Sequence, residues 1–349
     1  MPPTIVNPTG EAEWEVAARE AILDLLTDRL VVPWVEAEAR IWQGWKDYPH
    51  AQPLPLNAAR QKLRSEGAII EETTRHAVPV TTVRLPYPAG RQKELQRLAG
   101  RRRKKFRKYL AWTGNPALCG HHAERVVFES TQAVATDAGL YVPKQPLGKI
   151  TEVDGVEVPR GRTFDVLAHV LELPRLQSHT PLVFEVKNIH RWIYPWAKEL
   201  WELLIKAAEL SLTIPVLPAL VCVRYQYATQ RMAQDIGFLV AGMRDQLFSP
   251  AIDERQFAAV RDEFGLAILR HDGPKDEVMN FGRFIRQTPA KEADPWYRRQ
   301  VPRFRALARI ILDHDSLAES LPEDARTRVF ARFRAQVLQA QGLTFIRGW

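Results

Sequence analysis

The sequence predicts a mixed α/β protein in which a small helical domain with a β-hairpin precedes a domain built on a mixed sheet. Three observations support this class. Near the amino terminus, residues 11–30, 34–45 and 57–66 have helical periodicity. They are followed by two alternating runs typical of strands, at residues 68–73 and 78–85. Short apolar runs then alternate with helical segments between residues 120 and 248. Helical periodicity returns at residues 254–269 and 308–341, so we expect a helical carboxy-terminal region over 251–349.

Length and composition are those of a globular protein with more than one domain. The 349 residues suffice for two or three domains, and 46% are hydrophobic and 26% charged. Only two cysteines are present, Cys119 and Cys222, which excludes a disulfide framework and favours a reducing, cytoplasmic location. We find no apolar run of membrane-spanning length and no signal-like amino terminus, so we expect no membrane association.

The charge is positive and uneven. The formal net charge is +8, which favours a polyanionic partner. Residues 101–108 read RRRKKFRK, a run that can contact several phosphates without reading sequence. The alternative is a solvated helix face or linker that keeps the protein soluble. We assign 91–118 as a basic linker and expect DNA contacts from Arg101, Arg102, Arg103, Lys104, Lys105, Arg107 and Lys108.

The first 90 residues are expected to form a separate domain of three helices and a β-hairpin. Asn57 is a good helix N-cap and Gly67 a good stop, so a third helix precedes the hairpin. Three helices and a hairpin resemble a winged helix-turn-helix. That resemblance implies that Leu56, Ala59 and Leu63 face inward and that DNA is contacted by Arg60, Gln61, Arg64 and, at the wing tip, Arg75 and His76. The alternative is a helical domain that docks a partner protein through the same surface.

Two strongly apolar runs each contain an acidic residue. Asp165 lies within FDVLA, and Glu185 lies within LVFEVK. An unpaired buried carboxylate is costly, so each needs a partner. Side chains two apart on a strand share a face, which places Lys187 beside Glu185. If the strand bearing Asp165 lies next to it, two carboxylates and one ammonium converge, as suits Mg²⁺-dependent phosphate chemistry.

These residues also carry a resemblance. Asp165, a spacer of 19 residues and then Glu185-Val186-Lys187 resemble the D…(D/E)-x-K signature of the PD-(D/E)XK nuclease superfamily, which has the restriction-endonuclease-like fold. Upstream, the spacing from Gly120 to Glu124 is similar to that family's first-helix G-x-x-x-E pattern, with Glu129 as a substitute. Downstream, residues 195–210 read as a helix and residues 219–223 as a short strand. Residues 228–248 then resemble the closing helix, the edge strand and the last helix of Holliday-junction-resolvase-like members. The resemblance covers about 120–250, and we assign 119–250 to a nuclease-like domain.

The resemblance implies an Mg²⁺-dependent DNA endonuclease, with Mn²⁺ as a substitute, acting in genome defence or recombination. In that family's scheme Asp165, Glu185 and the carbonyl of Val186 hold the metal, Lys187 positions the attacking water, and Glu124 orients metal-bound water. A symmetric homodimer would suit a double-strand cut.

Alternatives remain at the level of sequence. No proline precedes Asp165, and Asp154-Gly155 reads as a hairpin turn rather than a third site position. Glu185 and Lys187 could form a surface ion pair on an edge strand, with Asp165 neutralised by an arginine such as Arg162. The domain could also be an inert DNA-binding or scaffold element, or a subunit of a multiprotein complex in which cleavage needs activation.

Overall fold

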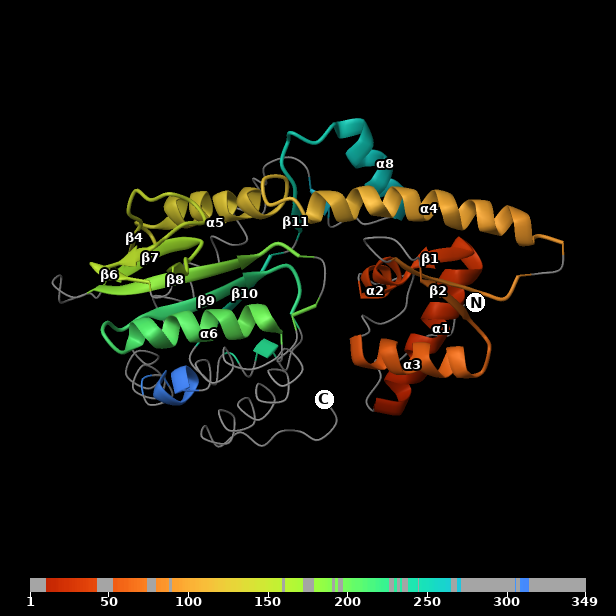
Figure 1. The fold of residues 1–349 in the computed structure, drawn as a ribbon, viewed down its shortest axis with the longest axis horizontal. Helices are drawn as coiled ribbons and strands as arrows, with labels where there is room; N and C mark the ends of the chain where they lie inside the picture. The colour runs from red at the N-terminus through yellow and green to blue at the C-terminus, as the bar shows by residue number, and fades with distance from the viewer. Residues whose placement is uncertain are drawn as a thin grey trace. The chain divides into compact units, whose positions relative to one another are not determined.

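The computed structural model describes residues 11–42, 53–73, 80–87, 90–158, 161–171, 179–189, 192–193, 197–225, 229–230, 233, 238–243, 245–264, 269–270, 305 and 308–313. The chain is mixed α/β and forms two compact units (Figure 1). Unit 1 comprises Met1–Leu118 together with Pro250–His271, and unit 2 comprises Cys119–Ser249 together with Asp272–Trp349.

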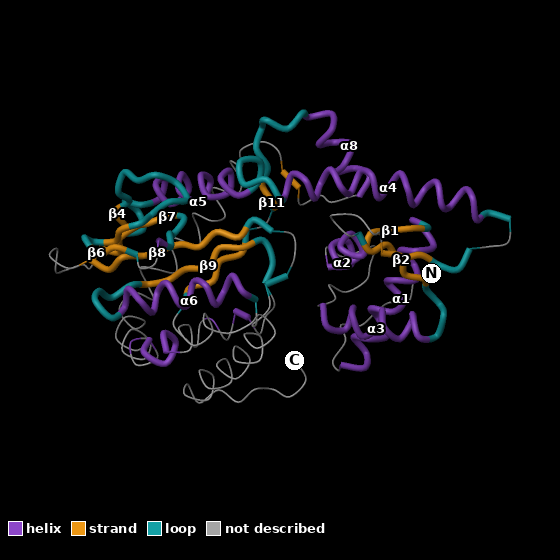
Figure 2. The backbone as a smooth tube through the Cα atoms, viewed as in Figure 1, coloured by secondary structure: helices purple, strands orange, loops and turns teal. Residues whose placement is uncertain are grey.

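Unit 1 begins with three helices and a three-stranded sheet (Figure 2). Their order is α1 (Glu11–Arg29), β1 (Val31–Pro33), α2 (Trp34–Trp42), α3 (Pro53–Ser65), β2 (Ile70–Thr73) and β3 (Thr81–Arg84). Both neighbours of β3 are antiparallel to it, in the sheet order β1-β3-β2. The hairpin was expected, whereas β1 was not, because three residues between two helices are too few to show an alternating pattern.

The interior of this part follows helical spacing. Leu56, Ala59 and Leu63 of α3 are fully buried, as their spacing predicts. They pack with apolar side chains of α1, with Val32 of β1 and with Val83 of β3 in one core. The opposite face of α3, which includes Gln61, is exposed.

The basic run belongs to a helix and is not a linker. Helix α4 (Gln92–Thr113) buries one side chain every three or four residues, namely Leu95, Ala99, Arg102, Phe106 and Tyr109. Helix α8 (Glu254–Phe264) packs on this stripe, with the Phe264 ring edge-on to Phe106 at 5.5 Å and the Phe257 ring stacked on Trp112 at 6.1 Å between centroids. This buried stripe was not predicted from the sequence, because basic residues flank its apolar positions along the chain.

Unit 2 is built on a five-stranded mixed sheet. Its strands are β4 (Leu140–Tyr141), β7 (Val166–Leu171), β8 (His179–Lys187), β9 (Leu217–Cys222) and β10 (Leu239–Gly242), in the order β10-β9-β8-β7-β4. Strands β8, β9 and β10 are parallel, while β7 is antiparallel to β8 and to β4. Helix α5 (Gly120–Val134) covers one face and α6 (Lys198–Ser211) the other (Figure 1).

A small hairpin, β5 (Glu152–Val153) and β6 (Val156–Glu157), packs against this sheet. Its turn is Asp154-Gly155, as expected, and both residues have positive φ, at 50° and 78°. Val153 and Val158 are buried in the same core as Leu167 of β7, Val183 of β8 and Trp201 of α6.

The expected last helix before residue 250 is wrong. Residues Gln246–Leu247 form strand β11, and both the N–H and the C=O of Leu247 are bonded by the side-chain amide of Asn188. A side chain thus takes the backbone groups that a helix would have used. The edge-strand prediction is confirmed by β10, which lies at one end of the sheet order.

The remaining described residues are few. Strand β12 spans Leu269–Arg270, and residues 308–313 are helical. The rest of the helix expected at 308–341 lies outside the described residues. Within the part of the chain that the structure describes, no helix has both the length and the hydropathy needed to cross a membrane.

Candidate active site

Asp165 and Glu185 meet because β7 and β8 are antiparallel neighbours. Val166 pairs with Phe184, and Asp165 N–H donates to the carbonyl of Phe184 at 3.0 Å. Two residues beyond Phe184 along β8, the N–H of Val186 donates to Oδ2 of Asp165 at 2.6 Å. The carboxylate of Asp165 is therefore held against the backbone between Glu185 and Lys187.

Glu185 is held between two lysines. Its carboxyl is 5% exposed, and Oε1 lies 2.5 Å from Nζ of Lys187, as expected for neighbours on one face of a strand. Its other oxygen, Oε2, pairs with Nζ of Lys206 from α6. Lys206 also donates to the carbonyl of Thr163 at 2.8 Å, three residues before β7 begins at Val166. This buried lysine was not predicted, although a lysine within the apolar segment LWELLIKAAEL was a usable signal.

Glu124 completes the cluster from α5. It is buried, and among the described residues nothing bonds to its Oε2. Gly148, whose N–H donates to the carbonyl of Asp165 at 3.0 Å, approaches Glu124 so closely that a Cβ at this position would clash with its carboxylate. The substitute considered from sequence, Glu129, is exposed on the same helix.

Burial and like charge shift the ionisation of these groups. Burial, followed by the charge of Glu185, raises the pKa of Asp165 to about 7. Burial also raises the pKa of Glu124. Burial alone would lower the pKa of Lys187, but the charge of Glu185 and its hydrogen bond outweigh that effect and the pKa lies above its ordinary value. Three carboxylates thus face two ammonium groups, and the excess negative charge is suited to a cation with oxygen ligands.

The surface ion-pair alternative does not fit this geometry. Strand β8 lies inside the sheet, between β7 and β9, and not at an edge. Arg162 pairs with Glu209 of α6 at 3.3 Å.

The residues expected to contact DNA from unit 1 have different surroundings. Gln61 and Arg64 are exposed, with Arg64 3.7 Å from Glu71. Arg60 donates two hydrogen bonds to Glu71, at 2.5 and 3.0 Å, and lies over the ring of Trp34. The expected wing tip, Arg75 and His76, lies outside the described residues.

The seven basic residues of the run 101–108, which lies within α4, divide into three groups. The exposed side chains are those of Arg101, Lys104 and Lys108, of which Lys108 donates to Oε1 of Gln256 at 3.4 Å. Partly buried side chains are those of Arg103, bonded to Glu72 at 2.6 Å, Lys105, bonded to Glu263 at 2.5 Å, and Arg107. Arg102 is buried, so the prediction that it contacts DNA is wrong.

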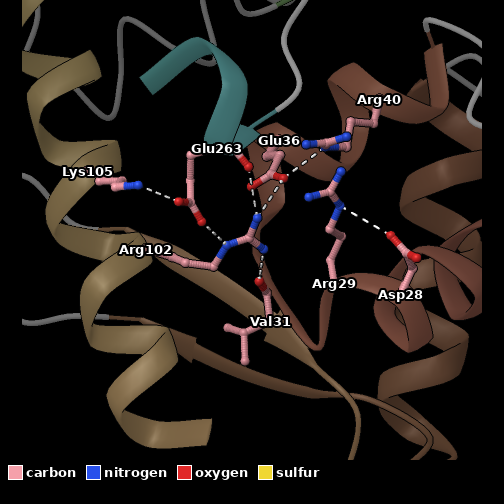
Figure 3. Close-up of polar contacts among 8 residues, drawn as sticks. All are labelled: Asp28, Arg29, Val31, Glu36, Arg40, Arg102, Lys105 and Glu263. Carbon is pink, nitrogen blue, oxygen red and sulfur yellow. Dashed lines mark hydrogen bonds and ion pairs between the residues drawn. The ribbon is translucent and has the colours of Figure 1, made fainter. Parts of the chain in front are cut away.

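Arg102 serves the interior of unit 1 instead (Figure 3). It donates to the carbonyls of Val31 and Glu263 and to the side chains of Glu36 and Glu263, the last at 3.1 Å. Glu36, which is fully buried, also accepts a hydrogen bond from Arg40 at 2.8 Å. Burial raises the pKa of Glu36 to about 7, against the opposing charges of Arg102 and Arg40. The result is an ion network that joins β1, α2, α4 and α8.

Both cysteines are structural. Cys119 Sγ contacts the carbonyl of Asn188 at 3.2 Å, and burial raises the pKa of its thiol to about 12. Cys222 lies fully buried on β9. Burial of this kind disfavours the thiolate form that a nucleophilic cysteine uses.

Comparisons with protein-family models, with curated proteins and with solved structures give no match. The chemistry of the cluster therefore has to be inferred from its own geometry and charge.

Proposed function

We propose that unit 2 is a metal-dependent nuclease that hydrolyses phosphodiester bonds in DNA. The observation that carries this proposal is the convergence of Asp165, Glu185 and Glu124 with Lys187 at the junction of β7 and β8. These carboxylates are buried or half-buried, and their charge exceeds what Lys187 and Lys206 neutralise. Buried clusters with shifted pKa values are enriched at functional sites.

The donor set fits Mg²⁺, with Mn²⁺ as a substitute. Asp165 and Glu185 would hold the ion, and the backbone of Val186 is bonded to the same carboxylate of Asp165. Oε2 of Glu124, without a partner among the described residues, is a further oxygen available to the ion or its water. When bound, such an ion acidifies a coordinated water and neutralises charge on the scissile phosphate.

The chain's own groups divide the remaining work. Lys187 is 22% exposed, so its ammonium can reach both Glu185 and an incoming phosphate. It would position the attacking water and stabilise the negative charge that develops on phosphorus ligands in the transition state. Lys206, buried beneath Glu185, would fix the orientation of that carboxylate. Glu124 would accept a proton from the water and orient it.

The order of elements supports the same proposal. Helix α5 carries Glu124, antiparallel β7 and β8 carry the D…E-x-K residues, and α6 leads into parallel β9. This is the order we expect for the PD-(D/E)XK superfamily. In unit 1, three helices precede the hairpin of β2 and β3, which is the order we expect for a winged helix-turn-helix, and α3 presents Gln61 and Arg64 to solvent. Duplex DNA is therefore the proposed substrate.

Cleavage of supercoiled plasmid tests the proposal. Wild type, Lys187→Ala and the exposed-lysine control Lys144→Ala are each incubated with Mg²⁺ or with EDTA. We expect nicking or linearisation by wild type and control only with Mg²⁺, and a loss of about two to three orders of magnitude in rate for Lys187→Ala. Cleavage by Lys187→Ala at the rate of the control would overturn the assignment. Salt-sensitive plasmid binding by all three without cleavage would instead favour a DNA-binding subunit.

A further inference from the structure

A second cluster lies along β7 and β8, away from the carboxylates. Asp154, His169 and His179 each direct one ligand atom at the others, and these three atoms lie within 4.8 Å of one another. Nε2 of His169 is 2.7 Å from Oδ1 of Asp154, and Nε2 of His179 is 3.1 Å from Oδ2 of the same carboxylate. His169 follows Asp165 by four residues, which corresponds to roughly 13 Å along a strand.

The topology explains why these residues meet. His169 pairs with Pro181, and His179 pairs with Leu171. The two histidines therefore lie on the same face of adjacent antiparallel strands, as diagonal neighbours offset by two residues in the register. Their rings are 4.8 Å apart and edge-on. Asp154 arrives from the turn of the β5–β6 hairpin, where its positive φ, tolerated by an Asp, directs the side chain back onto the sheet.

Two imidazole nitrogens and one carboxylate oxygen are the donor set of a transition metal rather than of Mg²⁺. In a tetrahedral zinc site with bonds of 2.0–2.2 Å, neighbouring ligand atoms lie about 3.3 Å apart. The three ligand atoms, one from each residue, lie within 4.8 Å of one another, so shifts of up to about 1.5 Å would bring them to that spacing.

Proton placement also permits it. His169 is only 7% exposed, and its Nδ1 has no hydrogen-bond partner among the described residues. An ionised carboxylate can only accept, so in the contact with Asp154 it is Nε2 of His169 that carries the proton. A cation at the site would take the place of this proton, so that the neutral imidazole of His169 binds through Nε2.

We propose that Asp154, His169 and His179 form a binding site for a divalent transition metal of the Zn²⁺ class. His179 is 49% exposed and Asp154 26%, so a cation reaches the site from solvent and keeps a coordination position for water. The bound ion ties the hairpin, whose Val153 and Val158 are core residues, to β7 and β8. This site is independent of the proposed nuclease chemistry.

The test is calorimetric titration of the full-length chain, free of any histidine tag, with Co²⁺ and then Zn²⁺ in the presence of excess Mg²⁺. We expect one equivalent to bind to wild type, accompanied for Co²⁺ by a visible absorption band. Binding is expected to be lost in His179→Ala, which alters an exposed side chain, and in Asp154→Asn, because Asn tolerates the same positive φ.

Two controls make the outcome specific. His121→Ala removes an exposed histidine elsewhere in unit 2, and Glu185→Gln alters the carboxylate cluster. Both are expected to bind one equivalent as wild type does. The proposal is overturned if wild type binds neither ion, if His179→Ala and Asp154→Asn bind like wild type, or if Glu185→Gln abolishes the binding.

Discussion

Units 1 and 2 each bury a group of acidic and basic side chains, and the two groups have opposite balances of charge. In unit 1, Glu36 and Glu263 meet three cations, Arg40, Arg102 and Lys105. In unit 2, two ammonium groups, Lys187 and Lys206, meet the carboxylates of Glu185, Asp165 and Glu124. The unit 1 group therefore has one cationic group more than it has carboxylates, and the unit 2 group has one carboxylate more than it has ammonium groups.

The surroundings of the two groups differ in the same sense. Arg102 donates hydrogen bonds to the backbone carbonyls of Val31 and Glu263 (Figure 3). These bonds hold β1 and the end of α8 against α4. In unit 2, Glu124 keeps an oxygen without a partner among the described residues, and Lys187 reaches solvent. Buried charges bonded to the backbone hold segments together, whereas a buried carboxylate oxygen with no partner among the described residues is suited to a bound cation.

The first prediction separates activity from stability. Asp165→Asn is expected to lower the cleavage rate by about a thousandfold, since it removes a metal ligand. In EDTA the same variant should be no less stable than wild type, because it relieves repulsion from Glu185 while Asn can still accept the hydrogen bond from Val186. Rates and urea unfolding are compared with those of Asp137→Asn, an exposed control. A variant that loses rate only because it unfolds would remove the contrast between the units.

The second prediction concerns unit 1, where removing a buried charge should lower the stability of the fold. Arg102→Ala is expected to lower the free energy of unfolding by about 3–5 kcal/mol, since it leaves the Glu36 carboxylate buried without one of its partners. Arg101→Ala, the adjacent exposed arginine, should change it by less than about 0.5 kcal/mol. Both are measured by urea denaturation. Equal stability of the two variants would show that the network does not hold unit 1 together.

The third prediction uses the pH dependence of the same network. Because the folded pKa of Glu36 is raised from 4.5 to about 7, the native state binds a proton that the unfolded chain has released. This stabilising contribution is full below pH 4.5 and is lost as the pH rises through 7, by up to about 3 kcal/mol. Glu36→Gln cannot titrate here. Unfolding curves from pH 4.5 to 8 should therefore show wild type losing stability relative to the variant; parallel curves would contradict the shifted pKa.

The fourth prediction concerns Lys206, the buried lysine beneath Glu185 that was not among the site residues expected from the sequence. Lys206→Met keeps the length of the side chain but removes the ammonium that orients Glu185. We expect the cleavage rate to fall by about 10–100-fold, as for other residues that support a metal ligand. The exposed lysine variant Lys149→Met should cleave like wild type. If Lys206→Met matches that control, the ion pair beneath Glu185 has no part in catalysis.

How far sequence predicts these features depends on whether a contact is local or tertiary. The pairing of Glu185 with Lys187 follows from the two-residue period of a strand, and the approach of Asp165 follows once β7 and β8 are neighbours. Lys206 could not be placed, because the rotation of α6 against the sheet is set by packing. Arg102 was misassigned because the helix that buries it, α8, comes about 150 residues later in the chain.

The same limit applies to the smaller elements. Strand β1 is three residues long and shows its role only when paired with β3. The cluster of Asp154, His169 and His179 is drawn from a turn and two strands, and its spacing along the chain matches no compact motif. Side-chain clusters of this kind become visible only when the register of the strands is known.

The central claim is that the surplus of carboxylates in unit 2 binds a divalent cation, and Mg²⁺ titration by calorimetry tests it most directly. Wild type, Arg102→Ala and Asp165→Asn are compared under conditions in which each is folded. Mg²⁺ disfavours histidine ligands, so the titration reports the carboxylate cluster and not the site at Asp154. We expect wild type and Arg102→Ala to bind Mg²⁺ and Asp165→Asn to lose this binding. Binding that survives unchanged in Asp165→Asn, or that is absent from wild type, would contradict the claim.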